Sequence, residues 1–147
     1  MKAKVLQRSR ILRYEGSFPT LSAFFLSPSP VVADSETVEM HGDGSCTESG
    51  EAVSLSYREE ESGVSVAVEK NGNELTIVRD GSPLVFRVGE TTSFHYSPTC
   101  GTFLIEAYTD ALTVQRKGDA LLLTLSYTAA MGGMAQRTEM RFKIIKK

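Results

Sequence analysis

The sequence predicts an all-β fold, an antiparallel meander of about eight to ten strands that closes into a barrel. From residue 36 onward, apolar and polar residues alternate with a period of two, which is typical of strands with one buried face. Turn sequences that contain glycine or asparagine separate these runs. A meander this long leaves two exposed edges unless its ends meet, so the pattern favours a closed barrel over an open sheet.

The first part of the chain is predicted to contain a strand followed by a long connection. Residues 4–13 favour a strand, although their apolar residues fit neither period cleanly. Residues 14–35 are predicted to be an insertion or long loop, and they are rich in proline and serine. This segment also contains large apolar side chains: Phe18, Leu21, Phe24, Phe25 and Leu26. So much apolar surface should be buried, so we expect an irregular segment or a single helical turn held against a barrel end or a neighbouring subunit.

The remaining strands follow from the alternation and from the turns between them. They are predicted at 37–42, 52–58, 64–70, 74–79, 84–88, 93–97, 102–109, 111–116, 120–129 and 134–145. Tight turns are predicted at Asn71-Gly72-Asn73, Asp80-Gly81-Ser82-Pro83, Lys117-Gly118-Asp119 and Gly132-Gly133, where glycine and asparagine adopt positive φ at low steric cost. We expect residues 1–147 to form one β-barrel domain, because the pattern contains no repeat and no second unit.

The charge of the chain argues against a polyanionic partner. The net charge is −2, so no excess of positive charge favours nucleic acid or an anionic membrane. Residues 1–33 are basic and residues 34–69 carry ten acids, and we expect these two segments to pair with each other. No stretch is long enough to span a membrane. The sequence therefore predicts no nucleic-acid partner and no membrane partner.

Two cysteines and a short apolar patch bear on the compartment. Cys46 and Cys100 are far apart and form no disulfide framework. The apolar patch at 21–26 is only six residues long and is flanked by prolines, unlike a secretory signal. A reduced, cytoplasmic location is therefore expected.

Several motifs contain residue types that are common in catalytic or metal sites but lack the pattern that such sites need. The run from Gly42 to Cys46 is interpreted as a β-turn rather than as a nucleophile motif. His41 and His95 alternate with polar residues, so both are expected to face solvent and not to bind metal. The acidic run 59–61 is interpreted as a solvated loop. The sequence thus predicts no catalytic constellation, no metal and no cofactor.

Three tyrosines are the most interesting polar candidates. Tyr57, Tyr96 and Tyr127 each fall on the apolar face of a predicted strand, so their phenols are expected to point into the barrel. A buried phenol normally finds a hydrogen-bond partner. They are either core tyrosines bonded to the backbone or speculative ligand-binding residues in a cavity.

A family resemblance supports the barrel. The matching segments include Ser49-Gly50-Glu51, Leu55 to Glu60, Leu75 to Arg79 with Gly81, and Tyr96-Ser97-Pro98-Thr99-Cys100-Gly101-Thr102. From Thr37 onward the chain resembles the YwiB-like family of uncharacterised bacterial domains. The resemblance implies a calycin-like, lipocalin-like β-barrel, with residues 14–33 as an insertion after the first strand. A fold does not imply an activity.

Two functions remain open at this point. The protein is predicted to be a small β-barrel that binds a small apolar or neutral molecule, or else a structural or protein-interaction module whose barrel is filled by its own side chains. It is not expected to be an enzyme, and it is expected to be a monomer or a small homo-oligomer. Bulky residues at inward positions, such as Phe86 and Phe142, favour a filled core.

Overall fold

The computed structural model describes residues 1–96 and 103–147. It contains ten strands and one short helix. Their bounds are β1 (Lys2–Tyr14), α1 (Leu21–Phe25), β2 (Val32–Ser49), β3 (Ala52–Glu59), β4 (Ser65–Asn71), β5 (Glu74–Arg79), β6 (Ser82–Arg87), β7 (Thr91–Tyr96), β8 (Phe103–Lys117), β9 (Ala120–Met131) and β10 (Met134–Lys146). The side chain of Tyr96 and the segment 97–102 lie outside the description.

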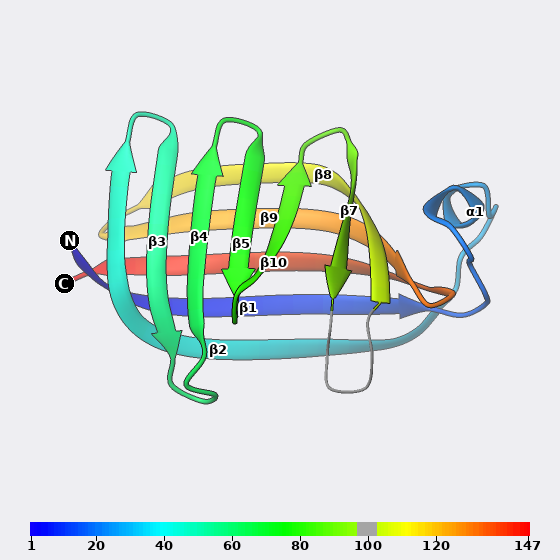
Figure 1. The fold of residues 1–147 in the computed structure, drawn as a ribbon, viewed down its shortest axis with the longest axis horizontal. Helices are drawn as coiled ribbons and strands as arrows, with labels where there is room; N and C mark the ends of the chain where they lie inside the picture. The colour runs from blue at the N-terminus through cyan, green and yellow to red at the C-terminus, as the bar shows by residue number, and fades with distance from the viewer. Residues whose placement is uncertain (97–102) are drawn as a thin grey trace.

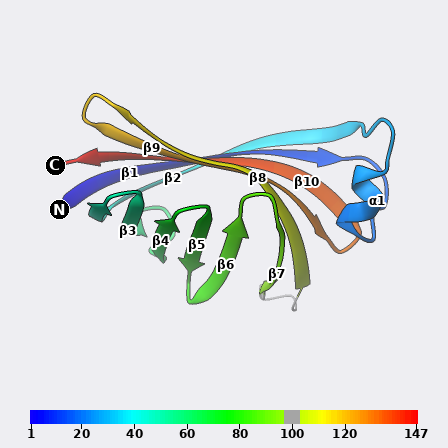
Figure 2. The same ribbon diagram turned by 90° about the horizontal axis from the view of Figure 1, so that it is seen from above.

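All strands belong to one antiparallel sheet that closes into a nearly complete barrel (Figure 1). The strand order is β6-β5-β4-β3-β2-β1-β10-β9-β8-β7, so β1 joins the two ends of the chain by pairing with both β2 and β10. The short strands β3 to β7 form one wall, and the long strands β8, β9, β10 and β1 form the other (Figure 2). The predicted all-β meander closed into a barrel is confirmed.

A seam remains between β6 and β7, which are the two edges of the sheet. The Thr92 hydroxyl donates to the Val85 carbonyl oxygen across this seam at 2.6 Å. The backbone between the two strands also docks on β8, because the Gly89 N–H donates to the Thr109 carbonyl at 2.8 Å and the Thr109 N–H donates to the Glu90 carbonyl at 3.3 Å. These bonds use part of the hydrogen-bonding capacity of the two edges, which would otherwise be open to pairing with another chain.

The long strands differ from the prediction in two places. The run from Gly42 to Cys46, interpreted as a turn, is continuous strand inside β2, so the strand predicted at 37–42 extends over 32–49. The strands predicted at 102–109 and 111–116 form the single strand β8, with a shift of register between Thr109 and Ala111. The other predicted turns separate the strands as expected.

Two glycines explain why β2 bends without ending. A Cβ on Gly44 would lie 1.8 Å from the Ser56 carbonyl oxygen, and a Cβ on Gly42 would lie 2.3 Å from the Arg58 carbonyl oxygen. β2 turns here from the long wall of the barrel to the short one (Figure 1). Glycine is required because the backbone of β3 approaches the inner side of this corner too closely for any side chain.

The inward faces of both walls build one hydrophobic core. Its largest fully buried side chains come from both walls and include Phe86, Phe142, Leu55, Leu75, Leu121, Leu123, Leu125 and Ile144. The alternation predicted for the C-terminal strand is confirmed over 138–144, where Phe142 and Ile144 are buried while Arg141 and Lys143 are exposed. At the start of the strand it is reversed, because Met134 is 56% exposed and Ala135 is buried.

The connection between β1 and β2 carries α1, which packs on the outside of the sheet. Phe18 and Phe24 are buried there against Ala135 and Tyr14. The Thr20 hydroxyl caps the helix by accepting the Ala23 N–H at 3.1 Å. The segment is therefore pinned by its aromatic residues, as predicted, but it covers the outer face near one end of the long strands (Figure 2). Within the described part of the chain, no helix is both long and apolar enough to cross a membrane.

Candidate functional site

A cavity of about 370 Å³ opens at one end of the barrel. Its walls are mostly apolar and come from six strands. The lining residues are Arg13, Leu84, Phe94, Ile105, Tyr127, Ala129, Met131, Met134 and Gln136. The volume lies in the range of about 300–1,000 Å³ that is typical of small-molecule sites. Methionines suit such a wall because their flexible thioethers adapt to the shape of a ligand.

Tyr127 is the predicted tyrosine that lines this cavity. Its ring packs on Phe86, with ring centroids 4.7 Å apart, and Phe86 in turn contacts Phe94 edge-on at 5.6 Å. Burial raises the pKa of the Tyr127 phenol above its ordinary value. The phenol therefore stays protonated at neutral pH and can donate a hydrogen bond to a neutral acceptor.

Two buried threonines flank Tyr127 in the sheet. Thr109 on β8 and Thr138 on β10 are both paired with Tyr127, and therefore share its inward face. Their side chains are 0% and 2% exposed, and neither Oγ1 makes a hydrogen bond of normal geometry with the residues that the structure describes. The Thr138 hydroxyl lies close enough to the phenol to offset part of the rise in the pKa of Tyr127. We call Thr109 and Thr138 the threonine belt. An unpaired buried hydroxyl costs stability, so a further hydrogen bond to this belt would be favourable.

Arg13 is the charged residue at the mouth of the cavity, and its charge is already matched. Its guanidinium donates to Glu36 at 2.7 Å and to Asp34 at 3.0 Å. The hydrogen bond to Glu36, and to a smaller extent the one to Asp34, raises the pKa of Arg13. Together with the Arg8–Glu39 ion pair, these contacts confirm that the basic N-terminal segment pairs with the acidic stretch. The mouth does not present a free cation to a ligand.

The opposite end of the barrel is closed by an inward ion pair. Glu48 has a side chain only 13% exposed and accepts from Lys146 and Arg116. The hydrogen bond from Lys146 lowers the pKa of Glu48 below its ordinary value, because its effect is larger than the opposing effect of burial. Between this closed end and the cavity, the core is filled by aliphatic and aromatic side chains.

Tyr57 lies in the filled part of the core and does not line the cavity. Its side chain points inward as predicted and is 6% exposed. Burial, with a smaller contribution from the nearby Glu59 carboxylate, raises the pKa of the Tyr57 phenol far above its ordinary value. Tyr57 and Tyr127 are therefore both inward tyrosines, but only Tyr127 faces the cavity. The side chain of the third candidate, Tyr96, is outside the described residues.

The acidic run 59–61 is not wholly a solvated loop. Glu59 is the last residue of β3 and takes an inward position, where its side chain is 3% exposed. Burial opposes its ionisation, but hydrogen bonds from Arg79 at 2.8 Å and Ser62 at 2.6 Å outweigh burial and lower the pKa of Glu59. The interpretation was wrong for Glu59 because the inward parity of β3 continues to its final residue.

The remaining candidates, His41, His95 and Cys46, do not line the cavity. His41 and His95 are exposed as predicted, and the Nδ1 of His41 lies 2.8 Å from the Glu61 carboxylate. Cys46 is buried and free, and burial raises the pKa of its thiol. Among the residues that the structure describes, no three histidine, cysteine or carboxylate side chains gather in a metal-binding cluster.

The alternation predicts inward positions for several lining residues but does not predict the cavity that they form. By the alternation of their strands, Phe94 and Ile105 take inward positions, and Met134 and Gln136 fall on the mostly apolar face of residues 134–145. An inward position was not predicted for Arg13, because the apolar residues of 4–13 fit neither period cleanly. The strand register could have placed it, since Arg13 follows the inward residues Val5, Ser9 and Ile11 at even spacing on β1.

Comparison with known proteins identifies the family. Residues 31–143 match the family described as "Domain of unknown function (DUF1934)". The chain belongs to this DUF1934 family. No curated protein sequence matched the chain.

The DUF1934 fold of this chain is also similar to a solved structure. The crystal structure of the ywiB protein from Bacillus subtilis superimposes with a TM-score of 0.65 at 16% sequence identity. The match covers 96% of this chain and 91% of the other. At this level of identity the likeness shows the fold alone, and it confirms the resemblance to the YwiB-like family.

Proposed function

We propose that this DUF1934 protein is a non-catalytic, calycin-like barrel that binds a small apolar or neutral molecule in the cavity at its open end. The cavity lined by Tyr127 carries the proposal, because it combines apolar walls with a few polar groups at fixed positions. The walls would bury the body of the ligand. Tyr127, which lines the cavity and is flanked in the sheet by the two buried threonines, would orient one hydroxyl, carbonyl or amide group.

The charges at the mouth favour a neutral ligand over an acid. A free arginine would attract a carboxylate, but Arg13 already shares hydrogen bonds with two carboxylates. An anion entering the cavity would meet Asp34 and Glu36 close to the same guanidinium. Moving a charged group from water into the apolar interior would also cost on the order of several kcal/mol, because the ion loses its solvation.

The lining residues support binding rather than catalysis. Apart from Arg13 and Tyr127 they are apolar side chains and one amide. A nucleophile needs an adjacent base, and a phenol with a raised pKa is a poor base at neutral pH. We also propose that the protein works in the reducing bacterial cytoplasm as a monomer or small homo-oligomer. The buried free thiol of Cys46 is consistent with a reducing compartment.

A second candidate function is a structural or protein-interaction module. The filled core between the cavity and the Glu48 end favours it, since side chains alone occupy that part of the barrel. In this case the open end would be a packing defect without a ligand. The two candidates differ in whether the cavity binds a neutral molecule with a defined stoichiometry.

Titration with Nile red, a neutral apolar fluorophore, tests the proposal. The native protein should give a saturable, blue-shifted signal with one site. Ala129→Phe fills the cavity and should weaken binding at least tenfold, whereas Ala67→Phe on the exposed face of β4 should leave it unchanged. Equal binding by the two variants would place the dye elsewhere and refute the proposed site.

A further inference from the structure

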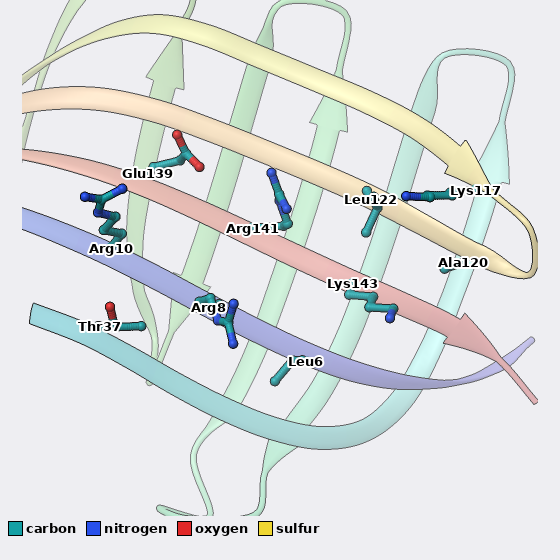
Figure 3. Close-up of a pocket in the computed structure, with 10 residues that line it drawn as sticks. All are labelled: Leu6, Arg8, Arg10, Thr37, Lys117, Ala120, Leu122, Glu139, Arg141 and Lys143. Carbon is teal, nitrogen blue, oxygen red and sulfur yellow. The ribbon is translucent and has the colours of Figure 1, made fainter.

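The outer face of the long wall contains a second hollow, of about 920 Å³. It lies outside the barrel, on the face turned away from the short strands (Figure 3). We call it the outer groove. Its lining residues are Leu6, Arg8, Arg10, Thr37, Lys117, Ala120, Leu122, Glu139, Arg141 and Lys143.

The outer groove is strongly basic although the chain carries a net charge of −2. Its lining contains five cationic side chains and one carboxylate. Arg8 is compensated by Glu39, which accepts from its guanidinium at 2.6 and 3.0 Å. Arg10, Lys117, Arg141 and Lys143 form no ion pair with the described residues. Positive potential therefore gathers on one face of an otherwise acidic molecule.

The register of β1 and β10 places one like-charge pair in the groove, next to the opposite-charge pair of Arg10 and Glu139. Arg8 lies directly opposite Arg141, and both point to the outer face. Like charges in directly opposed positions destabilise a sheet. An anion bound between the two guanidinium groups would relieve this repulsion. The arrangement is therefore better suited to a bound polyanion than to the free surface.

The shape and floor of the groove restrict the kind of polyanion. Leu6, Ala120 and Leu122 are the apolar residues of the lining, and none of the described residues that line the groove is aromatic. Bases recognised by stacking need aromatic platforms. Alternate residues of a strand are about 6–7 Å apart, which spaces the cations of β1 and β10 along a line. A narrow chain with regularly repeated charges fits better than a flat membrane.

We propose that the outer groove binds a single strand of nucleic acid through its phosphate backbone, without reading the bases. Three of the five cations are arginines, whose forked donors match phosphate oxygens, and the regularly repeated charges of a nucleic-acid backbone suit cations spaced along two strands. The inference is independent of the ligand in the barrel cavity, since the two sites lie on opposite faces of the same wall. It runs against the sequence-based expectation of no nucleic-acid partner.

Fluorescence anisotropy with labelled oligo(dT) and oligo(U) tests this inference. Both should bind the full-length protein at low salt, and the logarithm of affinity should fall with the logarithm of salt with a slope of about −2 to −3, as expected for three to four phosphate contacts. Arg141→Glu with Lys143→Glu should weaken binding at least tenfold. The matched control, Arg58→Glu with Lys70→Glu, reverses two charges outside the groove lining and should change affinity less than twofold.

Stability measurements separate a binding defect from a folding defect. Arg141→Glu replaces a like-charge pair with an attractive one opposite Arg8, so the melting temperature should stay the same or rise while binding falls. Absence of oligonucleotide binding at low salt, or equal losses in the groove and control variants, would overturn the inference. Tighter binding of a poly-glutamate peptide than of the oligonucleotides would also overturn it, and would indicate an acidic protein partner.

Discussion

The two inward tyrosines show how burial sets the chemistry of single residues. Tyr57 and Tyr127 occupy equivalent inward positions on facing walls, yet one is enclosed by the core and the other borders the cavity. For both, loss of solvent raises the pKa of the phenol because the phenolate would be poorly solvated. A buried tyrosine of this kind makes the free energy of unfolding decrease at alkaline pH.

Tyr57→Phe should make the protein more resistant to alkali. Below pH 10.0, the ordinary pKa of tyrosine, the phenol is neutral in the folded and unfolded states and contributes no pH dependence. Above it, only the unfolded state releases the proton, so stability falls as pH rises, by about 1.4 kcal/mol per pH unit per tyrosine. Urea unfolding at neutral pH should therefore differ little between variant and native protein, and the variant should lose less stability near pH 11. Identical alkaline losses would show that Tyr57 ionises freely in the folded protein.

At the scale of elements, the corner of β2 is the feature that shapes the barrel. One strand of eighteen residues serves both walls because Gly42 and Gly44 leave room for the backbone of β3. This is a steric requirement, since neither glycine has a positive φ.

Gly44→Ala should destabilise the barrel by about 3 kcal/mol, because overpacking against backbone cannot be relieved by a rotamer change. Gly72→Ala is the control. It lies in a turn with φ of 61° and open space around the added Cβ, so only backbone strain of about 1–2 kcal/mol is expected. Chemical denaturation measures both. A smaller loss for Gly44→Ala than for Gly72→Ala would contradict the steric account of the corner.

The α1 segment is a second element whose role can be tested. Phe24 is 7% exposed and packs against Phe18 and Tyr14, whereas Phe25 is 52% exposed and its ring lies edge-on to the rings of Phe24 and Tyr108. Phe24→Ser should therefore cost about 3 kcal/mol and Phe25→Ser about 1 kcal/mol, by analogy with truncation of buried and half-buried aromatic residues. Thermal melting and light scattering check this. A change of mass on Phe25→Ser would instead place the segment at a subunit interface.

Period-two alternation predicted most of these elements because each strand buries one face. The prediction failed where the local sequence is typical of a turn but the chain continues as a strand. The glycines near Cys46 resemble a turn, although they mark a bend within a strand. The shift at Thr109 inserts one residue into β8, which divided the strand into two in the prediction.

The candidate site was less predictable than the fold. Tyr127 could be predicted because it alternates with leucines. Glu59 was interpreted as part of a solvated loop, and Arg13 lies in a segment whose apolar residues fit neither period cleanly, so their inward positions were not predicted. The outer groove was hidden for a different reason. Its cations come from β1, β8 and β10, and only the pairing of the first strand with the last brings Arg8 beside Arg141.

At the scale of the whole molecule, the barrel has two unlike ends. The Glu48 ion pairs close one end, and the middle is packed with side chains. The other end holds the cavity, with the threonine belt beside Tyr127. A protein that served only as a filled scaffold would gain stability by closing this end with larger apolar residues. The open end is therefore the feature that the proposed function explains.

Native mass spectrometry of the purified protein, before and after incubation with decanol, tests the central claim most directly. Decanol is neutral and apolar and has one hydroxyl for Tyr127. We predict a bound species with one small molecule per chain in the native protein, reduced at least tenfold in Ala129→Phe and unchanged in Ala67→Phe. A native protein that carries no small molecule and takes up no decanol would contradict the account and leave the filled module as its function.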